Sequence, residues 1–249
     1  MSLSKRQLIK EKRRQERRRQ RVVTILIISG VALFIAALLA APTIQNALTP
    51  VGEIVQITPE ERPMVDGRAL GDPDAPVRIE VYEDFQCPAC RTFSSEIEPL
   101  LVANYVAGGQ VRYIFRHFPF LDDQAAGNES DQAANASMCA AEQGRFWDYH
   151  DMLFANWNGE NRGAFLDKRL VAFAEALDLD INEFNDCFEQ DEYEDVIAED
   201  LALGRQNGVN STPTILVNGK QVISATPRSV PSFQEIEQVV QTELSQSSK

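Results

Sequence analysis

The stretch VRIEVYEDFQCPACRTFSSEIEPLLVANY, residues 77–105, decides which fold to expect for this chain. Residues 77–82 are mostly β-branched or apolar, which is typical of a strand. The CPAC motif at 87–90 follows a short turn, and apolar residues then recur at helical spacing as far as Gly108. Residues 111–115 (VRYIF) predict a second strand. This order of strand, helix and strand is typical of a parallel crossover unit.

The remainder of the folded region adds helices and then two more strands. Residues from about 121 to 207 carry apolar stripes at helical spacing and predict a helical insertion. Residues 214–217 (TILV) predict a strand, and the Asn-Gly pair that follows predicts a hairpin to an antiparallel partner at 221–223. We therefore expect an α/β fold with a mixed sheet, helices on its faces and a helical insertion.

The N-terminal region combines a basic tail with a long uncharged segment. Residues 1–21 hold ten Lys or Arg and two Glu residues, although the whole chain has a net charge of −13. Residues 22–41 carry no charge, and a helix of this length spans roughly 30 Å, the thickness of the hydrocarbon core of a bilayer. Because positive flanks remain in the cytoplasm, the pattern predicts a single-pass signal-anchor with a cytoplasmic N-terminus.

Two other interpretations of this region fit the pattern less well. A cleaved signal peptide would have a shorter apolar core and a small-residue cleavage site, and a basic nucleic-acid-binding arm would leave the apolar run unexplained. Residues 42–73 have several prolines and few aromatics, so they predict a linker. Residues 74–245 then form the folded domain, which we expect outside the cytoplasm at the cell membrane.

The CPAC motif carries the predicted chemistry. Disulfide exchange needs a thiolate to attack and a second thiol to resolve the mixed disulfide. Cys87 would lie at a helix N-terminus, where backbone N–H groups and the helix dipole favour an anion and lower a thiol pKa of about 8.5 by several units. Pro88 suits the first helical position, where its missing N–H costs nothing. We therefore expect Cys87 to be the exposed nucleophile and Cys90 the more buried resolving thiol.

The main alternative for the motif is half of a zinc site, which would need two further ligands. Cys139 and Cys187 could supply them, but zinc ribbons and knuckles more often use two close pairs of cysteines, and these spacings are long. We therefore expect no metal. The exchange chemistry itself needs no cofactor beyond the cysteine pair.

Three segments together resemble a known family. They are residues 84–90 (DFQCPAC), 144–154 (GRFWDYHDMLF) and 211–214 (STPT). In this order they are similar to the DsbA-like thiol–disulfide oxidoreductases of the thioredoxin superfamily, over roughly residues 70–245. The resemblance implies a thioredoxin fold interrupted by a helical domain. It also implies a cis proline opposite the active site, at Pro213, with Thr212, Pro213, Pro88 and Ala89 along the substrate groove.

This sequence departs from the family pattern at two positions. The strongest oxidants of the family carry a histidine just before the second cysteine, where this chain has Ala89. Thioredoxin-like proteins often have a buried acid six residues before the first cysteine, and here that residue is Val81. Glu83 and Asp84 lie nearby and are candidate proton acceptors for Cys90. The alternative for Asp84 is that it only fixes the turn into the helix.

Cys139 and Cys187 lie on predicted helices of the insertion. The favoured interpretation is a structural disulfide, since an even number of cysteines in an exported protein suggests pairing, and some family members carry a similar extra pair. Two buried free thiols or a second redox pair remain alternatives. His150 lies on an apolar helix face, which indicates a core histidine, and packing is also the favoured role of His117.

The sequence therefore predicts a membrane-anchored protein disulfide oxidoreductase that forms disulfides in cysteine-containing exported proteins. A membrane redox partner would recycle the cysteine pair, and no nucleic acid is expected as a partner. An extracytoplasmic reductase or isomerase is the alternative within the enzyme class, because direction depends on the redox potential. An anchored, non-catalytic binding or chaperone module is the alternative outside it.

Overall fold

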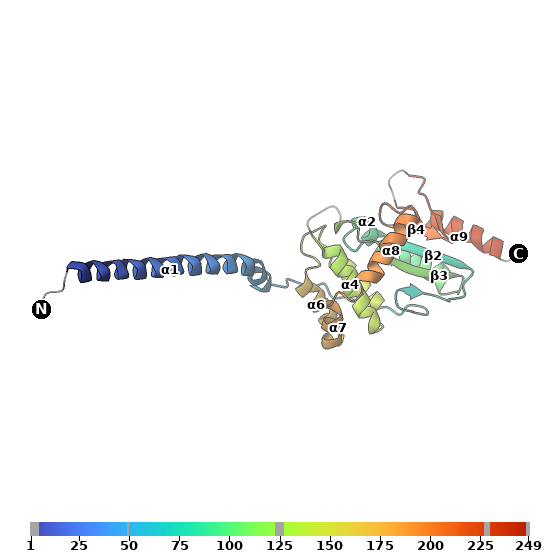
Figure 1. Cartoon of the computed structure of the whole chain (residues 1–249). Helices are drawn as coiled ribbons and strands as arrows, with labels where there is room; N and C mark the ends of the chain where they lie inside the picture. The colour runs from blue at the N-terminus through green and yellow to red at the C-terminus, as the bar shows by residue number, and fades with distance from the viewer. Residues whose placement is uncertain (1–4, 49, 123–126, 227–229, 248–249) are drawn as a thin grey trace. The chain divides into compact units, whose positions relative to one another are not determined.

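The computed structural model describes residues 5–48, 50–122, 127–226 and 230–247. The chain divides into two units, residues 1–52 and 53–249. The first contains helix α1, Lys5–Leu48, drawn in blue in Figure 1. Within it, Arg17–Ala40 is long and apolar enough to cross a membrane, judged by length and composition alone. Residues 1–4 of the predicted tail and 123–126 of the predicted insertion lie outside the described residues.

The second unit is built on a mixed sheet, which confirms the predicted fold class. In the described residues five strands are hydrogen-bonded in the order β1-β3-β2-β4-β5. Strands β2 and β3 are parallel, and the other neighbours are antiparallel. The strands are β1 Ala69–Leu70, β2 Val77–Glu83, β3 Val111–His117, β4 Thr214–Val217 and β5 Lys220–Gln221. Strand β1 was not predicted from the sequence.

Helices cover the sheet and form the segment between β3 and β4 (Figure 1). The helices are α2 Pro88–Glu96, α3 Glu98–Leu101, the π-helix η1 Val102–Val106, α4 Glu129–Glu142, α5 Phe146–Ala155, α6 Asp167–Ala176, α7 Ile181–Phe188, α8 Glu194–Gln206 and α9 Phe233–Ser247. The sequence predicted one continuous helix after the CPAC motif. The structure divides it at Ile97, just before Pro99, which has no N–H to continue the helical hydrogen bonds.

Part of the segment predicted as a linker, residues 42–73, differs from that expectation. Helix α1 continues as far as Leu48. Further on, Ile54 and Ile57 pack against the hydrophobic core of the second unit. The guanidinium of Arg62 donates to Glu98 on α3 at 2.6 Å. Apolar and charged contacts therefore hold the later part of this segment on the domain.

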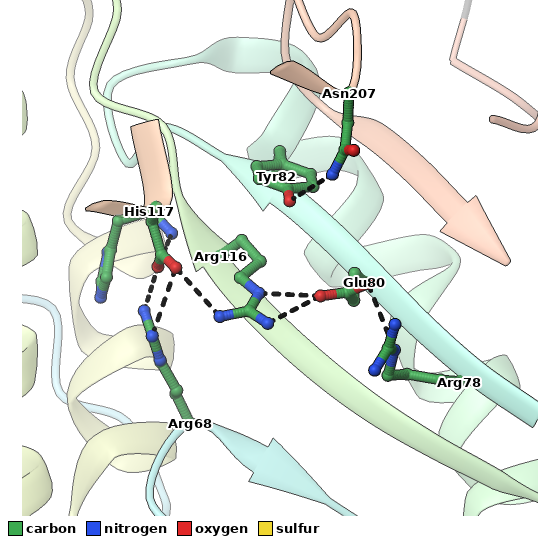
Figure 2. Close-up of polar contacts among 8 residues, drawn as sticks. Arg68, Arg78, Glu80, Tyr82, Arg116, His117 and Asn207 are labelled. Atoms are coloured by element: carbon green, nitrogen blue, oxygen red, sulfur yellow. Dashed lines mark hydrogen bonds and ion pairs between the residues drawn. The ribbon is translucent and has the colours of Figure 1, made fainter. Parts of the chain in front are cut away.

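The face of the sheet beneath α8 carries four charged residues that we call the ionic cluster: Arg68, Glu80, Arg116 and Asp200 (Figure 2). Arg116 donates to Glu80 at 2.7 Å and to Asp200 at 3.0 Å. Arg68 also pairs with Asp200. The second oxygen of Asp200 accepts the backbone N–H of His117 at 3.1 Å. The four charges therefore balance, and they attach α8 to strands β2 and β3.

Helix α8 reaches this face closely because of a glycine. A Cβ atom on Gly204 would lie 2.8 Å from the ring of Phe118 and 3.0 Å from that of Tyr82. Tyr82 also accepts a hydrogen bond from Asn207 at 3.3 Å. Side chains alternate along a strand, so Glu80 and Tyr82 point towards α8, whereas Val81 and Glu83 point to the opposite face. That second face bears the main core and the CPAC motif.

Candidate active site

Cys87 lies at the junction between strand β2 and helix α2. It is the N-cap residue of α2, and Pro88 follows as the first helical residue. Cys87 is only 7% exposed, and Cys90, one turn into the helix, is fully buried. Cys87 is therefore the more accessible thiol but is not exposed as predicted, because Thr212 lies against it. The Thr212 carbonyl oxygen is 3.4 Å from the Cys87 sulfur and accepts its hydrogen bond.

The two thiols have opposite electrostatic environments. A hydrogen bond from the Cys90 thiol is the largest influence on Cys87 and lowers its pKa to about 6; the neighbouring Thr212 and hydrogen bonds from the helix backbone act in the same direction, and together these effects outweigh that of burial. Burial raises the pKa of Cys90 well above its ordinary value, and the hydrogen bond to Cys87 raises it further. Near neutral pH the pair therefore holds one thiolate, on Cys87, and one thiol proton, on Cys90.

Of the predicted groove residues, Pro88 and Ala89 follow Cys87 in the chain, and Thr212 contacts its sulfur. Pro88 is exposed and Ala89 is half-buried. The Thr212–Pro213 peptide bond is cis, and Pro213 immediately precedes strand β4. These residues lie at the ends of two segments that are far apart in sequence, and the hydrogen bond between Cys87 and Thr212 joins them.

Asp84 is held by donors at the turn between β2 and α2. It accepts hydrogen bonds from the backbone N–H of Gln86 at 2.8 Å, the N–H of Leu121 at 3.1 Å and the hydroxyl of Ser130 at 2.7 Å. Burial nevertheless raises its pKa to about 7. These contacts favour the turn-fixing role of Asp84 over proton exchange with Cys90.

Glu83 has a different environment. Both carboxyl oxygens are buried, and neither has a hydrogen-bond partner among the described residues. Burial raises the pKa of Glu83 well above its ordinary value, repulsion from Glu98 and Cys87 raises it further, and the neighbouring Cys90 thiol lowers it. Glu83 is thus the carboxyl group that lies against Cys90, and it is the better candidate for the proton acceptor.

Glu83 belongs to a buried group with Glu98 and His150, which we call the acid cluster. One oxygen or nitrogen atom from each lies within 4.8 Å of the others. Such a set could hold a metal ion, but Glu98 already accepts from Arg62 at 2.6 Å and from the Tyr113 hydroxyl at 3.2 Å. A cation would have to displace the Arg62 guanidinium, so the arrangement favours protons over metal ions.

The insertion fixes the residue before Cys87. The buried side chain of Gln86 donates to Ser130 at 2.9 Å and accepts from the backbone N–H of Asn161 at 2.6 Å. The Gln86 carbonyl oxygen accepts from the indole N–H of Trp157, also at 2.6 Å. Two separate segments of the insertion therefore position the start of the CPAC motif.

Cys139 on α4 and Cys187 on α7 are joined by a disulfide in the structure. Glu142 and Glu192 lie close to Cys187, but a disulfide sulfur is not a thiolate, so this group is a poor metal site. The bond joins two helices of the insertion. Cys87 and Cys90 are both free thiols in this structure.

Sequence analysis did not identify Glu98 or Arg62 as members of the site, and it treated His150 only as a core residue. The available signals were a histidine on an apolar helix face and a charge within an apolar helical pattern. Neither signal reveals that the two residues meet, because Glu98 lies on α3 and His150 on α5.

Comparison with known proteins agrees with the fold and the motif. A family model described as thioredoxin matches residues 64–236. The probable disulfide bond formation protein D of Bacillus cereus is 25% identical over 181 residues, which cover 71% of this chain and 78% of that protein. The crystal structure of oxidised BdbD from Bacillus subtilis superposes with a TM-score of 0.62 at 23% identity, covering 78% of this chain and all of that chain.

Two further similarities bear on the assignment. A thioredoxin-like oxidoreductase from Silicibacter pomeroyi has a TM-score of 0.54 at 27% identity, covering 72% of this chain and 91% of that one. The Na(+)/H(+) antiporter NhaA 3 of Salinispora tropica is 37% identical over 151 residues, or 61% of this chain. The chain spans only about a fifth of that antiporter, 21% of its length, and we infer no ion transport from it.

The extent of the family match, together with the CPAC motif at the start of α2, settles the classification. This chain belongs to the thioredoxin family, and within that family it is similar to disulfide bond formation protein D of Bacillus cereus.

Proposed function

We propose that this protein forms disulfides in cysteine-containing exported proteins, with the Cys87–Cys90 disulfide as the oxidant. A substrate thiolate attacks Cys87, and a second substrate thiol then releases the enzyme with both cysteines reduced. Thr212 and Pro213, with Pro88 and Ala89, line the groove that receives the substrate. A membrane redox partner reoxidises the pair.

The position of Cys87 at the N-terminus of α2, with its lowered pKa, carries this proposal. Only the reduced pair contains the thiolate, so whatever stabilises the thiolate makes the disulfide a stronger oxidant. Each unit by which the pKa falls favours the thiolate by about 1.36 kcal/mol, and about 30 mV of reduction potential corresponds to 1.4 kcal/mol. A Cys87 pKa of about 6 thus favours oxidation of substrates over their reduction.

Ala89 supports the alternative within the enzyme class. The histidine that the strongest oxidants carry at this position is absent from the sequence, which weakens the thiolate relative to theirs. An extracytoplasmic reductase or isomerase would use the same two sulfurs but would be kept reduced in the cell. A non-catalytic binding module would need neither the free thiols nor their opposite pKa changes.

The reduction potential separates these functions. We would equilibrate the full chain, purified in detergent, with glutathione buffers and measure the fraction of free Cys87 and Cys90 thiols. An oxidase is expected nearer the potential of DsbA, about −120 mV, than that of thioredoxin, about −270 mV. A thioredoxin-like potential, with the pair reduced in intact cells, would establish the reductase or isomerase instead.

Trapping in cells tests the roles of the two cysteines. Cys90→Ala removes the resolving thiol, so substrates are expected to accumulate as mixed disulfides on Cys87 that disappear when the gel is run with reductant. Cys87→Ala is expected to trap nothing. The opposite pattern would reverse the roles, and a chain that traps nothing and exchanges with no dithiol peptide would be the non-catalytic module.

The same proposal includes a membrane topology. Residues 22–41 act as an uncleaved anchor, residues 1–21 remain in the cytoplasm, and the domain at 74–245 lies outside. The support is the apolar helical segment Arg17–Ala40 and the basic residues that precede it. Protease added to intact cells whose outer layers have been removed is expected to digest the domain. If the domain is digested only after the membrane is lysed, this topology is wrong.

A further inference from the structure

The acid cluster has Cys90 on one side and, on the other, residues that line a cleft separate from the substrate groove. This cleft has a volume of about 690 Å³, and Arg62 and Asp151 are among the residues that line it. We propose that Glu83 and His150, with Glu98 beside them, carry protons between Cys90 and this cleft. The proposal rests on the proposed function, since it concerns the proton that Cys90 exchanges in each catalytic cycle.

Cys90 needs such a route because it has no access to solvent. It is fully buried, and the described groups that influence its titration are Cys87, Thr212 and Glu83. In a mixed disulfide the Cys87 sulfur is bonded to substrate and cannot accept a proton. The Thr212 hydroxyl is not a base near neutral pH. Glu83 is then the acid–base group in contact with Cys90 among the described residues.

His150 is oriented to receive a proton on one side and release it on the other. Its Nδ1 lies 2.8 Å from Asp151 Oδ1, and a carboxylate there selects the tautomer with the proton on Nδ1. The buried Nε2 is left as an acceptor without a hydrogen-bond partner among the described residues. It lies 3.8 Å from Glu98 Oε2 and within 4.8 Å of Glu83, a gap that a side-chain rotation or one water molecule bridges.

Arg62 completes the outer end of the route. It donates to Glu98 at 2.6 Å and to both oxygens of Asp151 at 2.8 and 3.0 Å, and it lies 4.7 Å from the centre of the Trp147 ring. The side chain of Asp151 is 25% exposed, whereas that of Glu98 is fully buried. The guanidinium thus holds one carboxylate beside His150 and another at the cleft.

The titratable and charged groups around His150 come from every neighbouring element. They are Glu83 on β2, Tyr113 and His117 on β3, Glu98 on α3, Asp151 on α5 and Arg62 in the segment before β1. The remaining contacts are aromatic rings: Phe85, Phe115, Phe146, Trp147 and Phe154. Apolar rings around a few acid–base groups exclude bulk water, so the acid–base side chains are the groups that can pass a proton on.

The step balances for closure of the enzyme disulfide. Glu83 takes the proton of the Cys90 thiol as it yields its own proton to Nε2 of His150, and Nδ1 passes a proton to Asp151 and the cleft. The Cys90 thiolate then attacks the Cys87 sulfur of a mixed disulfide. A Cys87–Cys90 bond forms, the bond from Cys87 to the partner sulfur breaks, and the partner leaves as a thiolate with the electron pair. Oxidation of a substrate runs the same proton inwards.

Closure can be measured directly with glutathione. The reduced full chain in detergent is mixed with excess glutathione disulfide, quenched in acid and analysed by mass spectrometry, which separates attack by Cys87 from closure by Cys90. In His150→Gln we expect attack to be unchanged and closure at pH 7 to slow by about tenfold or more, because a positioned acid–base group contributes roughly 10²–10⁴-fold. Its closure rate should continue to rise with pH where that of the wild type levels off.

His117→Gln is the matched control. His117 is also buried and packs against Phe115 and Phe146, and its Nε2 also has no partner among the described residues, but it is not a member of the acid cluster. It should lose comparable stability and keep the wild-type closure rate and pH profile. Equal slowing in both histidine variants, or no slowing in His150→Gln, would overturn the relay.

If His150→Gln does not fold, Asp151→Asn provides the test of the proton relay. The amide still accepts the Nδ1 proton as a hydrogen bond but cannot take it up, so closure is expected to slow and to recover as imidazole buffer is increased. Wild-type closure in this variant would overturn the relay. Failure of the proposed function looks different, because the wild-type chain would then close normally and still not oxidise a dithiol peptide.

Discussion

The two faces of the central sheet both bury carboxylates, and they do so in different ways. Beneath α8, Glu80 and Asp200 each contact at least one arginine, and the ionic cluster is balanced (Figure 2). On the opposite face, Glu83 has no hydrogen-bond partner among the described residues. The Arg62 guanidinium is directed at Glu98 and Asp151 instead.

This difference separates a group that holds the fold from a group that is ready to react. A buried carboxylate paired with arginine stays ionised, and removing either partner leaves an uncompensated charge. A buried carboxyl without a partner favours its neutral form and can exchange a proton near neutral pH. The sheet is thus fixed from one side, while the chemistry of the CPAC motif lies on the other.

The largest expected effect is on the ionic cluster. Asp200→Ala removes the common partner of Arg68 and Arg116 and the acceptor of the His117 N–H. We expect the free energy of unfolding to fall by about 3 kcal/mol, since two half-buried cations lose the buried carboxylate that pairs with both. Urea denaturation of the full chain measures this. Glu199→Ala, an exposed acid on the same helix, should change stability by less than about 0.5 kcal/mol; equal effects would refute the comparison.

The second-largest effect is expected at the disulfide between Cys139 and Cys187, which belongs to neither the ionic cluster nor the acid cluster. The Cys139→Ser, Cys187→Ser double variant opens a disulfide that spans 48 residues. It should reduce stability by about 2–4 kcal/mol and leave thiol exchange intact, because neither sulfur is near Cys87. Thermal unfolding and a dithiol-peptide assay provide the two readouts. Unchanged stability, or activity lost in a folded variant, would contradict a purely structural role.

The third effect is a change in the pKa of Cys87, whose thiolate lies next to the acid cluster. Cys90→Ala removes the hydrogen bond that most lowers the pKa of Cys87, so that pKa should rise from about 6 by roughly one to two units, as a hydrogen bond to a charged group contributes about 1.5–3 kcal/mol. Thiolate absorbance at 240 nm measures it. A pKa that stays at 6 would assign the effect to the helix N-terminus.

The same depressed pKa has a consequence for stability. The pKa of the Cys87 thiol is lower in the folded than in the unfolded state, so its ionisation stabilises the folded, reduced protein. This contribution is complete at a pH above the unfolded-state pKa. It is lost as the pH falls towards the folded-state pKa. Relative to Cys87→Ser, the reduced protein should therefore gain stability between about pH 6 and about pH 8.5. A flat difference over that range would mean that Cys87 titrates normally.

The smallest effect, and the one of opposite sign, is expected at Glu83. Its pKa is raised by burial, so its contribution to stability is present below the unfolded pKa of about 4.3 and is lost as the pH rises. At pH 7, Glu83→Gln should thus be more stable than the wild type by about 1 kcal/mol. This difference in the free energy of unfolding should disappear as the pH falls. Destabilisation like that of Asp200→Ala would show that Glu83 is paired after all.

The sequence was sufficient for the features that depend on local pattern. The β-branched and apolar run at 77–82 and the Asn-Gly pair after 214–217 predicted strands that the structure contains, and the mixed sheet follows from their order. Strand β1 was missed because two residues, Ala69 and Leu70, have no periodicity to detect. The division of the helix at Ile97 could have been anticipated from Pro99, which has no N–H to donate to the preceding turn and is best tolerated in the first turn of a new helix.

The partners within the site were harder to predict, for a physical reason. Periodicity indicates which face of an element is buried, but not what that face meets. Arg62 lies 36 residues from Glu98 and 89 from Asp151, and only the folded chain brings the three together. The thiol motif was found because all its chemistry lies within four consecutive residues.

One of the chain's two tryptophans lies beside the CPAC motif and the other beside the acid cluster, so the protein contains two intrinsic fluorescent probes. Trp157 binds the Gln86 carbonyl oxygen beside the first cysteine, and Trp147 lies 5.2 Å from the His150 ring. Emission from Trp157 should therefore follow the making and breaking of the sulfur–sulfur bond, whereas emission from Trp147 should follow charge on the imidazole. Each single Trp→Phe variant keeps one of the two tryptophans, so the two events could be timed separately without an added dye.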